Sequence, residues 1–176
     1  CHYITDHSKA DVVVLEDNKQ LIKYKNCKIG TLKNIVVYAE KPEEDLVASF
    51  KSEGISVYHW PDFLALGTQV PSTEVTTRSD AIRPGNCSTL IYTSGTTGPP
   101  KAVMISHDNI TWTTRNLATF YPPFDHEDRI ISYLPLSHIA AQVIDVHVPL
   151  RCGACTYFCQ PDALKGTLTV TMKEVF

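Results

Sequence analysis

One short polar segment, residues 93–101, constrains this chain more than any other part of its sequence. It reads Thr-Ser-Gly-Thr-Thr-Gly-Pro-Pro-Lys and lies between two apolar runs, residues 90–92 and 102–105. Short apolar runs that are bounded by Gly and Pro are typical of strands. The pattern therefore predicts a strand, a polar loop and a second strand.

The composition of this loop suits the binding of phosphate groups. Gly95 and Gly98 have no Cβ, so the backbone can bring its N–H groups close to anionic oxygens. The threonine and serine hydroxyls add donors, and Lys101 adds a mobile positive charge. We therefore expect this loop to bind a polyphosphate. The residues expected to take part are Thr93, Ser94, Gly95, Thr96, Thr97, Gly98, Pro99, Pro100 and Lys101.

Two other interpretations of the loop fit its residues less well. A Walker P-loop needs G-x-x-x-x-G-K-[ST] with the lysine opening a helix, whereas Lys101 follows two prolines and precedes Ala102. The prolines also disfavour a helix at this point. An ordinary surface loop uses the same residue types. Turn chemistry alone, however, does not account for this mixture ending in a lysine between two strand-like runs.

The run Tyr-Thr-Ser-Gly-Thr-Thr-Gly-Pro-Pro-Lys, residues 92–101, resembles the signature loop of the adenylate-forming (AMP-binding) superfamily. Three further segments narrow the resemblance to the bubblegum-type long-chain acyl-CoA synthetases. They are residues 107–112 (His-Asp-Asn-Ile-Thr-Trp), 133–139 (Tyr-Leu-Pro-Leu-Ser-His-Ile) and 160–166 (Gln-Pro-Asp-Ala-Leu-Lys-Gly). The resemblance implies a long-chain fatty acid–CoA ligase that uses ATP, Mg²⁺ and coenzyme A in fatty acid metabolism.

The resemblance also implies roles for two residues, Lys101 and His138, as catalytic residues. In the family, a fatty carboxylate attacks the α-phosphorus of ATP, and coenzyme A then takes the acyl group from the adenylate. The loop donors and Lys101 would stabilise the charge on the departing pyrophosphate. His138 matches the family residue that lies between the phosphate site and the acyl pocket and changes orientation during the reaction. From the sequence position alone, His138 could equally donate to a nearby carbonyl.

The resemblance covers essentially the whole chain, but the chain covers only part of the family pattern. We expect residues 1–176 to form an incomplete N-terminal AMP-binding domain, with the C-terminal domain absent. The family segments that contact adenine and ribose, ligate Mg²⁺ and supply the C-terminal lysine have no match here, so no metal ligand is predicted. The isolated chain is therefore expected to be inactive. The alternative is a non-enzymatic truncated product that retains at most a phosphate-binding loop.

The remaining pattern predicts an α/β fold with mainly parallel strands. Apolar runs at residues 12–15, 35–38 and 55–58 alternate with helical patterns at residues 18–24 and 60–67. The first run is continuous, as in a strand buried on both faces. Residues 68–88 are polar and lack periodicity, so they are interpreted as a long connection.

The second half predicts a βαβ unit after the phosphate loop. Ser106 and Ser137 are the expected N-caps of two helices, and strands are expected at residues 129–134 and 154–159. An unfinished helix is expected at residues 165–176. One apolar face is expected on each capped helix. The first face comprises Ile110, Leu117, Ala118 and Tyr121, and the second comprises Ile139, Val143, Val146 and Leu150.

Composition restricts the partners. With 176 residues, a net charge of −3 and 43% hydrophobic residues, the chain resembles an ordinary globular protein, and it has no basic excess for nucleic acid. No run approaches the ~20 apolar residues of a membrane span. We expect a cytoplasmic location, with peripheral attachment to the endoplasmic reticulum membrane left open. The expected partners are a long-chain fatty acid, ATP and coenzyme A, with no protein partner.

The cysteines allow one alternative site. Cys152, Cys155 and Cys159 lie close together in the sequence after His147, so a Cys₃His zinc site is one possible interpretation. Residues 155–159, however, alternate as in a strand, and free cysteine packs as a small hydrophobic residue. Reduced thiols are the preferred interpretation, with no disulfide framework.

Overall fold

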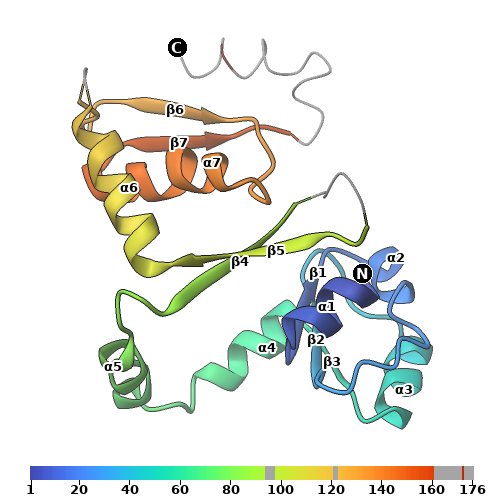
Figure 1. The fold of residues 1–176 in the computed structure, drawn as a ribbon. Helices are drawn as coiled ribbons and strands as arrows, with labels where there is room; N and C mark the ends of the chain where they lie inside the picture. The colour runs from blue at the N-terminus through green and yellow to red at the C-terminus, as the bar shows by residue number, and fades with distance from the viewer. Residues whose placement is uncertain (94–97, 121–122, 161–171, 173–176) are drawn as a thin grey trace. The chain divides into compact units, whose positions relative to one another are not determined.

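The computed structural model describes residues 1–93, 98–120, 123–160 and 172. The chain is a mixed α/β protein that divides into two compact units, Cys1–Ala81 and Ile82–Phe176. Each unit is described by itself, and Figure 1 traces both along the chain. Among the described residues, no helix is both long and apolar enough to cross a membrane. The helix predicted at residues 165–176 lies outside the described residues except for Met172.

A three-stranded parallel sheet forms the centre of the first unit. It consists of β1 (Val12–Leu15), β2 (Asn34–Val37) and β3 (Ser56–His59) in the order β1-β2-β3 (Figure 1). All three strands were predicted, to within a residue at each end. The prediction that the first strand is buried on both faces is wrong. β2 is the central strand and is buried, whereas Val12 and Val14 of the edge strand β1 are exposed.

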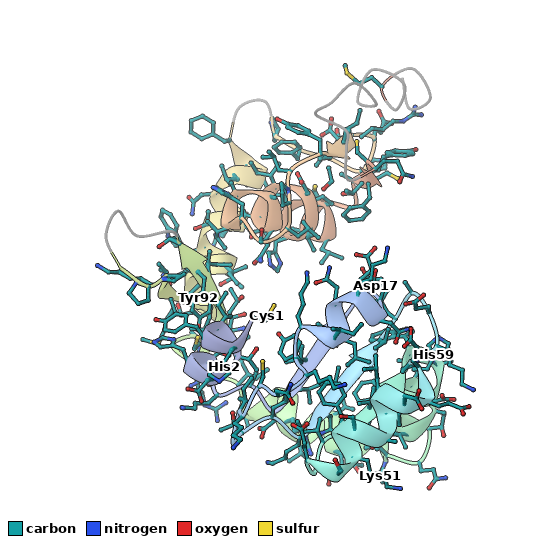
Figure 2. All side chains as sticks on the ribbon, turned by 90° about the vertical axis from the view of Figure 1, so that its right-hand side faces the viewer. Cys1, His2, Asp17, Lys51, His59 and Tyr92 are labelled. Atoms are coloured by element: carbon teal, nitrogen blue, oxygen red, sulfur yellow. The ribbon has the colours of Figure 1, made fainter. Side chains whose placement is uncertain are left out.

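Four helices flank this sheet in sequence: α1 (His2–Ser8), α2 (Asn18–Ile22), α3 (Glu44–Ser52) and α4 (Trp60–Gly67). Asp17, labelled in Figure 2, caps α2 because its side chain accepts a 2.8 Å hydrogen bond from the N–H of Gln20. α4 has its proline in the first turn and ends at Gly67, as predicted.

The core of the first unit is one hydrophobic cluster that joins β2 to α2 and α3. Phe50, Leu21 and Ile35 are its largest fully buried side chains. The other members come from the strands and from the connection between α2 and β2. They are Tyr24, Ile29, Leu32, Val37, Leu46 and Ile55.

The prediction of a long connection at residues 68–88 is wrong in the middle of that range, where Ser72–Ala81 forms helix α5. No residue of α5 is buried. A helix that buries no face needs no apolar stripe, so its sequence carries no helical period. An exposed pair between Arg78 and Glu74, 3.7 Å apart, links successive turns of this helix.

The second unit begins with an antiparallel hairpin of β4 (Cys87–Thr93) and β5 (Lys101–Ser106), followed by α6 (His107–Thr119) (Figure 1). The predicted strand, loop and strand are therefore confirmed. Ser106 is the N-cap of α6, as predicted. On the apolar face predicted for α6, Ile110 and Ala118 are buried and Leu117 is exposed, while Tyr121 lies outside the described residues.

The predicted βαβ unit follows and is confirmed. β6 (Arg129–Ser132) and β7 (Cys155–Phe158) pair in parallel, and the helical segment between them runs from Ile139 to Cys152. It consists of α7 (Ile139–Ala141), a π-helix labelled η1 (Gln142–His147) and α8 (Val148–Cys152). A small cluster of Ala118, Val143 and Val148 packs α6 against this segment.

Two details of the predicted second helix are wrong. Its N-cap is His138 rather than Ser137. Leu150, predicted to lie on the apolar face, is 78% exposed, and the fully buried residue is Val148. A π-helix closes its hydrogen bonds over five residues instead of four, so residues beyond η1 are rotated away from the face that an α-helix would give them.

Candidate functional site

The β4–β5 hairpin positions the two ends of the predicted phosphate loop. Thr93 pairs with Lys101, and Tyr92 pairs with Ala102, at the open end of the ladder. Tyr92 is labelled in Figure 2 on the strand that leads into the loop. Ser94, Gly95, Thr96 and Thr97 lie outside the described residues. The Thr93 hydroxyl at the start of the loop and the Lys101 ammonium at its end therefore belong to paired residues of the two strands.

Gly98 has the backbone conformation that only glycine adopts easily. Its φ is +94°, in the left-handed region, and a Cβ built there would meet no atom within 4 Å. The backbone angle, and not lack of space, therefore requires glycine here. Thr93 and Lys101 are both exposed, and the Lys101 side chain forms no hydrogen bond or ion pair with any other described residue. Its charge is available to a ligand.

The hairpin continues directly into α6 through a capping box. Ser106 Oγ accepts a hydrogen bond from the Asn109 N–H, and Asn109 Oδ1 accepts one from the Ser106 N–H, each 3.1 Å long. The N–H of Asp108 also donates to the carbonyl of Pro84, at 2.9 Å. These bonds satisfy donors at the start of α6 and fix the base of the hairpin to it.

His138, the second predicted catalytic residue, lies just beyond β6 at the start of α7. Its Nδ1 accepts a 3.1 Å hydrogen bond from the N–H of Ala140, so a neutral imidazole carries its proton on Nε2. The side chain is exposed. No hydrogen bond joins His138 to Lys101 in the described structure. The N–H group at Nε2 is thus free to donate to a ligand.

The turn before His138 is held by backbone acceptors. The His138 N–H donates to the carbonyl of Pro135 at 3.0 Å, and Gln142 Nε2 donates to the carbonyl of Leu136 at 2.7 Å. These contacts fix the segment between β6 and α7 from both sides. Sequence reasoning did not identify Gln142, because a polar residue near a helix start is common on exposed surfaces.

A buried polar contact, also missed from the sequence, ties β6 to the π-helix and β7. Ser132 Oγ donates to Asp145 Oδ2 at 2.8 Å, and Thr156 Oγ1 donates to the Asp145 carbonyl at 2.8 Å. Asp145 is only 7% exposed. The sequence signal that could have indicated this contact is the position of the acidic Asp145 between Val143 and Val146 of the predicted apolar face. Asp145 anchors the segment that begins at His138.

The alternative zinc site receives no support from the coordinates. Among the residues that the structure describes, no three His, Cys, Asp or Glu side chains gather closely enough to hold a metal ion. Cys152 Sγ instead donates to the carbonyl of Val148 at 3.0 Å, and Cys155 is exposed on β7. All the cysteines are free thiols.

The fold and the loop place the chain in a known class. The family model described as "AMP-binding enzyme" matches residues 1–175. The chain therefore belongs to the AMP-binding enzyme family, which confirms the family predicted from the loop.

Curated relatives narrow the class further. The chain is 41% identical over 178 residues to human "Long-chain-fatty-acid--CoA ligase ACSBG2", covering 99% of this chain and 25% of that protein. It is 41% identical to the Xenopus laevis protein of the same name, covering 99% and 23%, and 40% identical to mouse "Long-chain-fatty-acid--CoA ligase ACSBG1", covering 99% and 24%. The chain thus spans about a quarter of the length of these relatives.

Solved structures support the fold. The anthranilate CoA ligase AuaEII in complex with anthranoyl-AMP is similar with a TM-score of 0.66 and 20% identity, covering 96% of this chain and 29% of that one. The Vibrio cholerae adenylation domain AlmE in complex with glycyl-adenosine-5'-phosphate also gives 0.66, at 16% identity, covering 98% and 31%. The predicted α/β architecture of an adenylate-forming enzyme is therefore confirmed.

Proposed function

We propose that this chain supplies the phosphate-binding loop, and the His138 segment, of a long-chain fatty acid–CoA ligase. The observation that carries the proposal is the hairpin. It pairs the backbones of Thr93 and Lys101, leaves the Lys101 ammonium without a partner among the described residues, and has Gly98 in the left-handed region. The relatives with which the chain shares 41% identity over 99% of its length bear this activity in their names.

Lys101 acts by electrostatics in the first step. The oxygen of a fatty carboxylate forms a bond to the α-phosphorus of ATP, and the bond to pyrophosphate breaks, which leaves negative charge on the departing group. The Lys101 ammonium and the loop N–H groups stabilise that charge. Mg²⁺ bound to the phosphates of ATP would supply further positive charge there. Thr93 orients the phosphates through its exposed hydroxyl.

His138 acts next to the reacting carboxylate. Because Nδ1 is occupied by the Ala140 N–H, Nε2 is the donor that faces a ligand. A neutral donor at this point can hold the carboxylate and then turn away when coenzyme A attacks the acyl-adenylate. The alternative is a non-enzymatic product that retains at most a phosphate-binding loop.

Binding of ATP to the purified chain tests the proposal. We expect ATP and pyrophosphate to shift the amide NMR signals of β4 and β5, and Lys101→Gln to weaken both affinities by about tenfold or more, since charge-assisted contacts are lost. Lys19→Gln is the matched control, because Lys19 is an exposed lysine of α2 in the other unit. Equal affinities for the wild type and the Lys101 variant would overturn the proposal.

A further inference from the structure

A hollow separate from the hairpin lies between α6 and α8. Its volume is about 350 Å³. Binding sites for small ligands start at roughly 300 Å³, so the hollow has the size for one small molecule. The residues that line it are Ile110, Thr111, Thr114, His147, Leu150 and Arg151. None of them belongs to the phosphate loop.

Thr114 gives this hollow a buried hydroxyl without a partner. The residue is 6% exposed, and its Oγ1 makes no hydrogen bond within the described chain. Threonines in helices commonly donate to the carbonyl one turn back. Thr111 and Thr119 of the same helix do so, each at 3.0 Å, to His107 and Arg115. The Thr114 hydroxyl is therefore covered and left unsatisfied, in a residue that lines the hollow.

Two nitrogen-bearing side chains complete the set of donors. Arg151, in the last turn of α8, offers a planar fork of N–H groups, and His147 offers an imidazole. Neither side chain has a hydrogen bond or an ion pair with another described residue. The lining includes no carboxylate, so the charge of Arg151 is not balanced within the hollow. Ile110 and Leu150 add apolar surface beside these donors.

We propose that this hollow binds an oxyanion, either a phosphate or the carboxylate of a short organic acid. Arg151 is the charged partner, and the Thr114 hydroxyl and the His147 imidazole donate to the remaining oxygens. A guanidinium fork matches the oxygen geometry of both anions. The site goes beyond the proposed ligase function, because it uses neither Lys101 nor His138.

The test is an NMR titration of the purified chain with inorganic phosphate and, separately, with butyrate, at constant ionic strength set with chloride. We expect saturable shifts confined to the amides of residues 110–115 and 147–152. Arg151→Gln is expected to weaken binding about tenfold or more, because charge-assisted hydrogen bonds are lost. Arg115→Gln is the matched control, since Arg115 is an exposed arginine of α6 outside the lining. Binding of only phosphate or only butyrate shows whether the ligand of the hollow is a phosphate or a carboxylate.

Two more variants separate this site from structural effects and from the hairpin. Thr114→Val removes the hydroxyl at nearly constant shape, so we expect a higher Tm without ligand and weaker anion binding. Lys101→Gln is expected to leave the shifts at residues 147–152 unchanged while it weakens ATP binding. The proposal is overturned by three results: no saturable shift with either anion, equal losses in the Arg151 and Arg115 variants, or loss of the shifts in the Lys101 variant.

Discussion

At the scale of single residues, Gly98 shows how one backbone angle shapes the end of the predicted phosphate loop. Its φ of +94° lies where a Cβ is strained, although the space around it is open. The glycine directs the chain into Pro99 and Pro100, which have fixed φ and no N–H group. Residues 98–100 therefore lead directly into β5, where Lys101 pairs with Thr93.

Gly98→Ala is expected to weaken ATP binding without blocking it sterically. An L-residue in the left-handed region costs about 1–2 kcal/mol, so we expect a loss of roughly fivefold to thirtyfold in affinity, measured by titration calorimetry. Gly85→Ala is the matched control, because its surroundings are equally open and its φ is not in the left-handed region. If both variants bind ATP as the wild type does, the loop does not depend on this angle.

Ser132 is expected to matter more than its size suggests. Ser132→Ala leaves the buried Asp145 side chain without the donor at 2.8 Å, which should lower the free energy of unfolding by about 1–3 kcal/mol. Ser137→Ala changes an exposed serine nearby and should stay within about 0.5 kcal/mol. Urea denaturation measures both. A loss of about 1 kcal/mol for Ser137→Ala would instead restore Ser137 as the helix cap.

At the scale of elements, the strands and the hairpin could be predicted because their signals are local. Short apolar runs mark β1, β2, β3 and the β4–β5 pair, and Ser106 with Asn109 marks the start of α6. Helices α1 and α5 could not be predicted, since they bury almost no face. The π-helix is set by packing, and the contact between Ser132 and Asp145 joins residues 13 apart in the sequence, which no local pattern shows.

The π-helix makes a prediction about two neighbouring apolar residues. Val148 is fully buried against α6, so Val148→Ala should cost about 1–3 kcal/mol, through lost contacts and a small cavity. Leu150 is exposed, and Leu150→Ala should change the free energy of unfolding by less than about 0.5 kcal/mol. The opposite order in urea denaturation would mean that the helix is a regular α-helix with Leu150 on its buried face.

At the scale of the whole molecule, the two units contribute unequally to a possible catalyst. The first unit contains the larger hydrophobic cluster, whereas both predicted catalytic residues lie in the second. The described sheets of the second unit have only two strands each, and Phe158 on β7 is exposed. Sheets in globular proteins usually have about four to six strands. The described part of this unit therefore resembles a portion of a larger sheet assembly, consistent with relatives about four times as long.

The ligase activity is accordingly expected only when these residues are placed in a chain of full length. The phosphate loop by itself fixes neither the adenine nor the fatty acid, so the purified 176 residues should form no acyl-CoA from palmitate, ATP and coenzyme A. Human ACSBG2 with its aligned segment of 178 positions replaced by this chain should form palmitoyl-CoA.

In that chimera, Lys101→Ala should lower kcat about a hundredfold or more, because charge on the departing pyrophosphate loses its stabilising group. Lys19→Ala, which removes an exposed lysine of α2, should leave kcat unchanged and so controls for general effects of lost charge.

A folded chimera that binds ATP through Lys101 but makes no acyl-adenylate would support the non-enzymatic alternative. Full activity of the Lys101 variant would instead show that Lys101 of the hairpin is not needed for catalysis. Acyl-CoA formation by the 176 residues alone would contradict the expected inactivity and would assign the whole reaction to this chain.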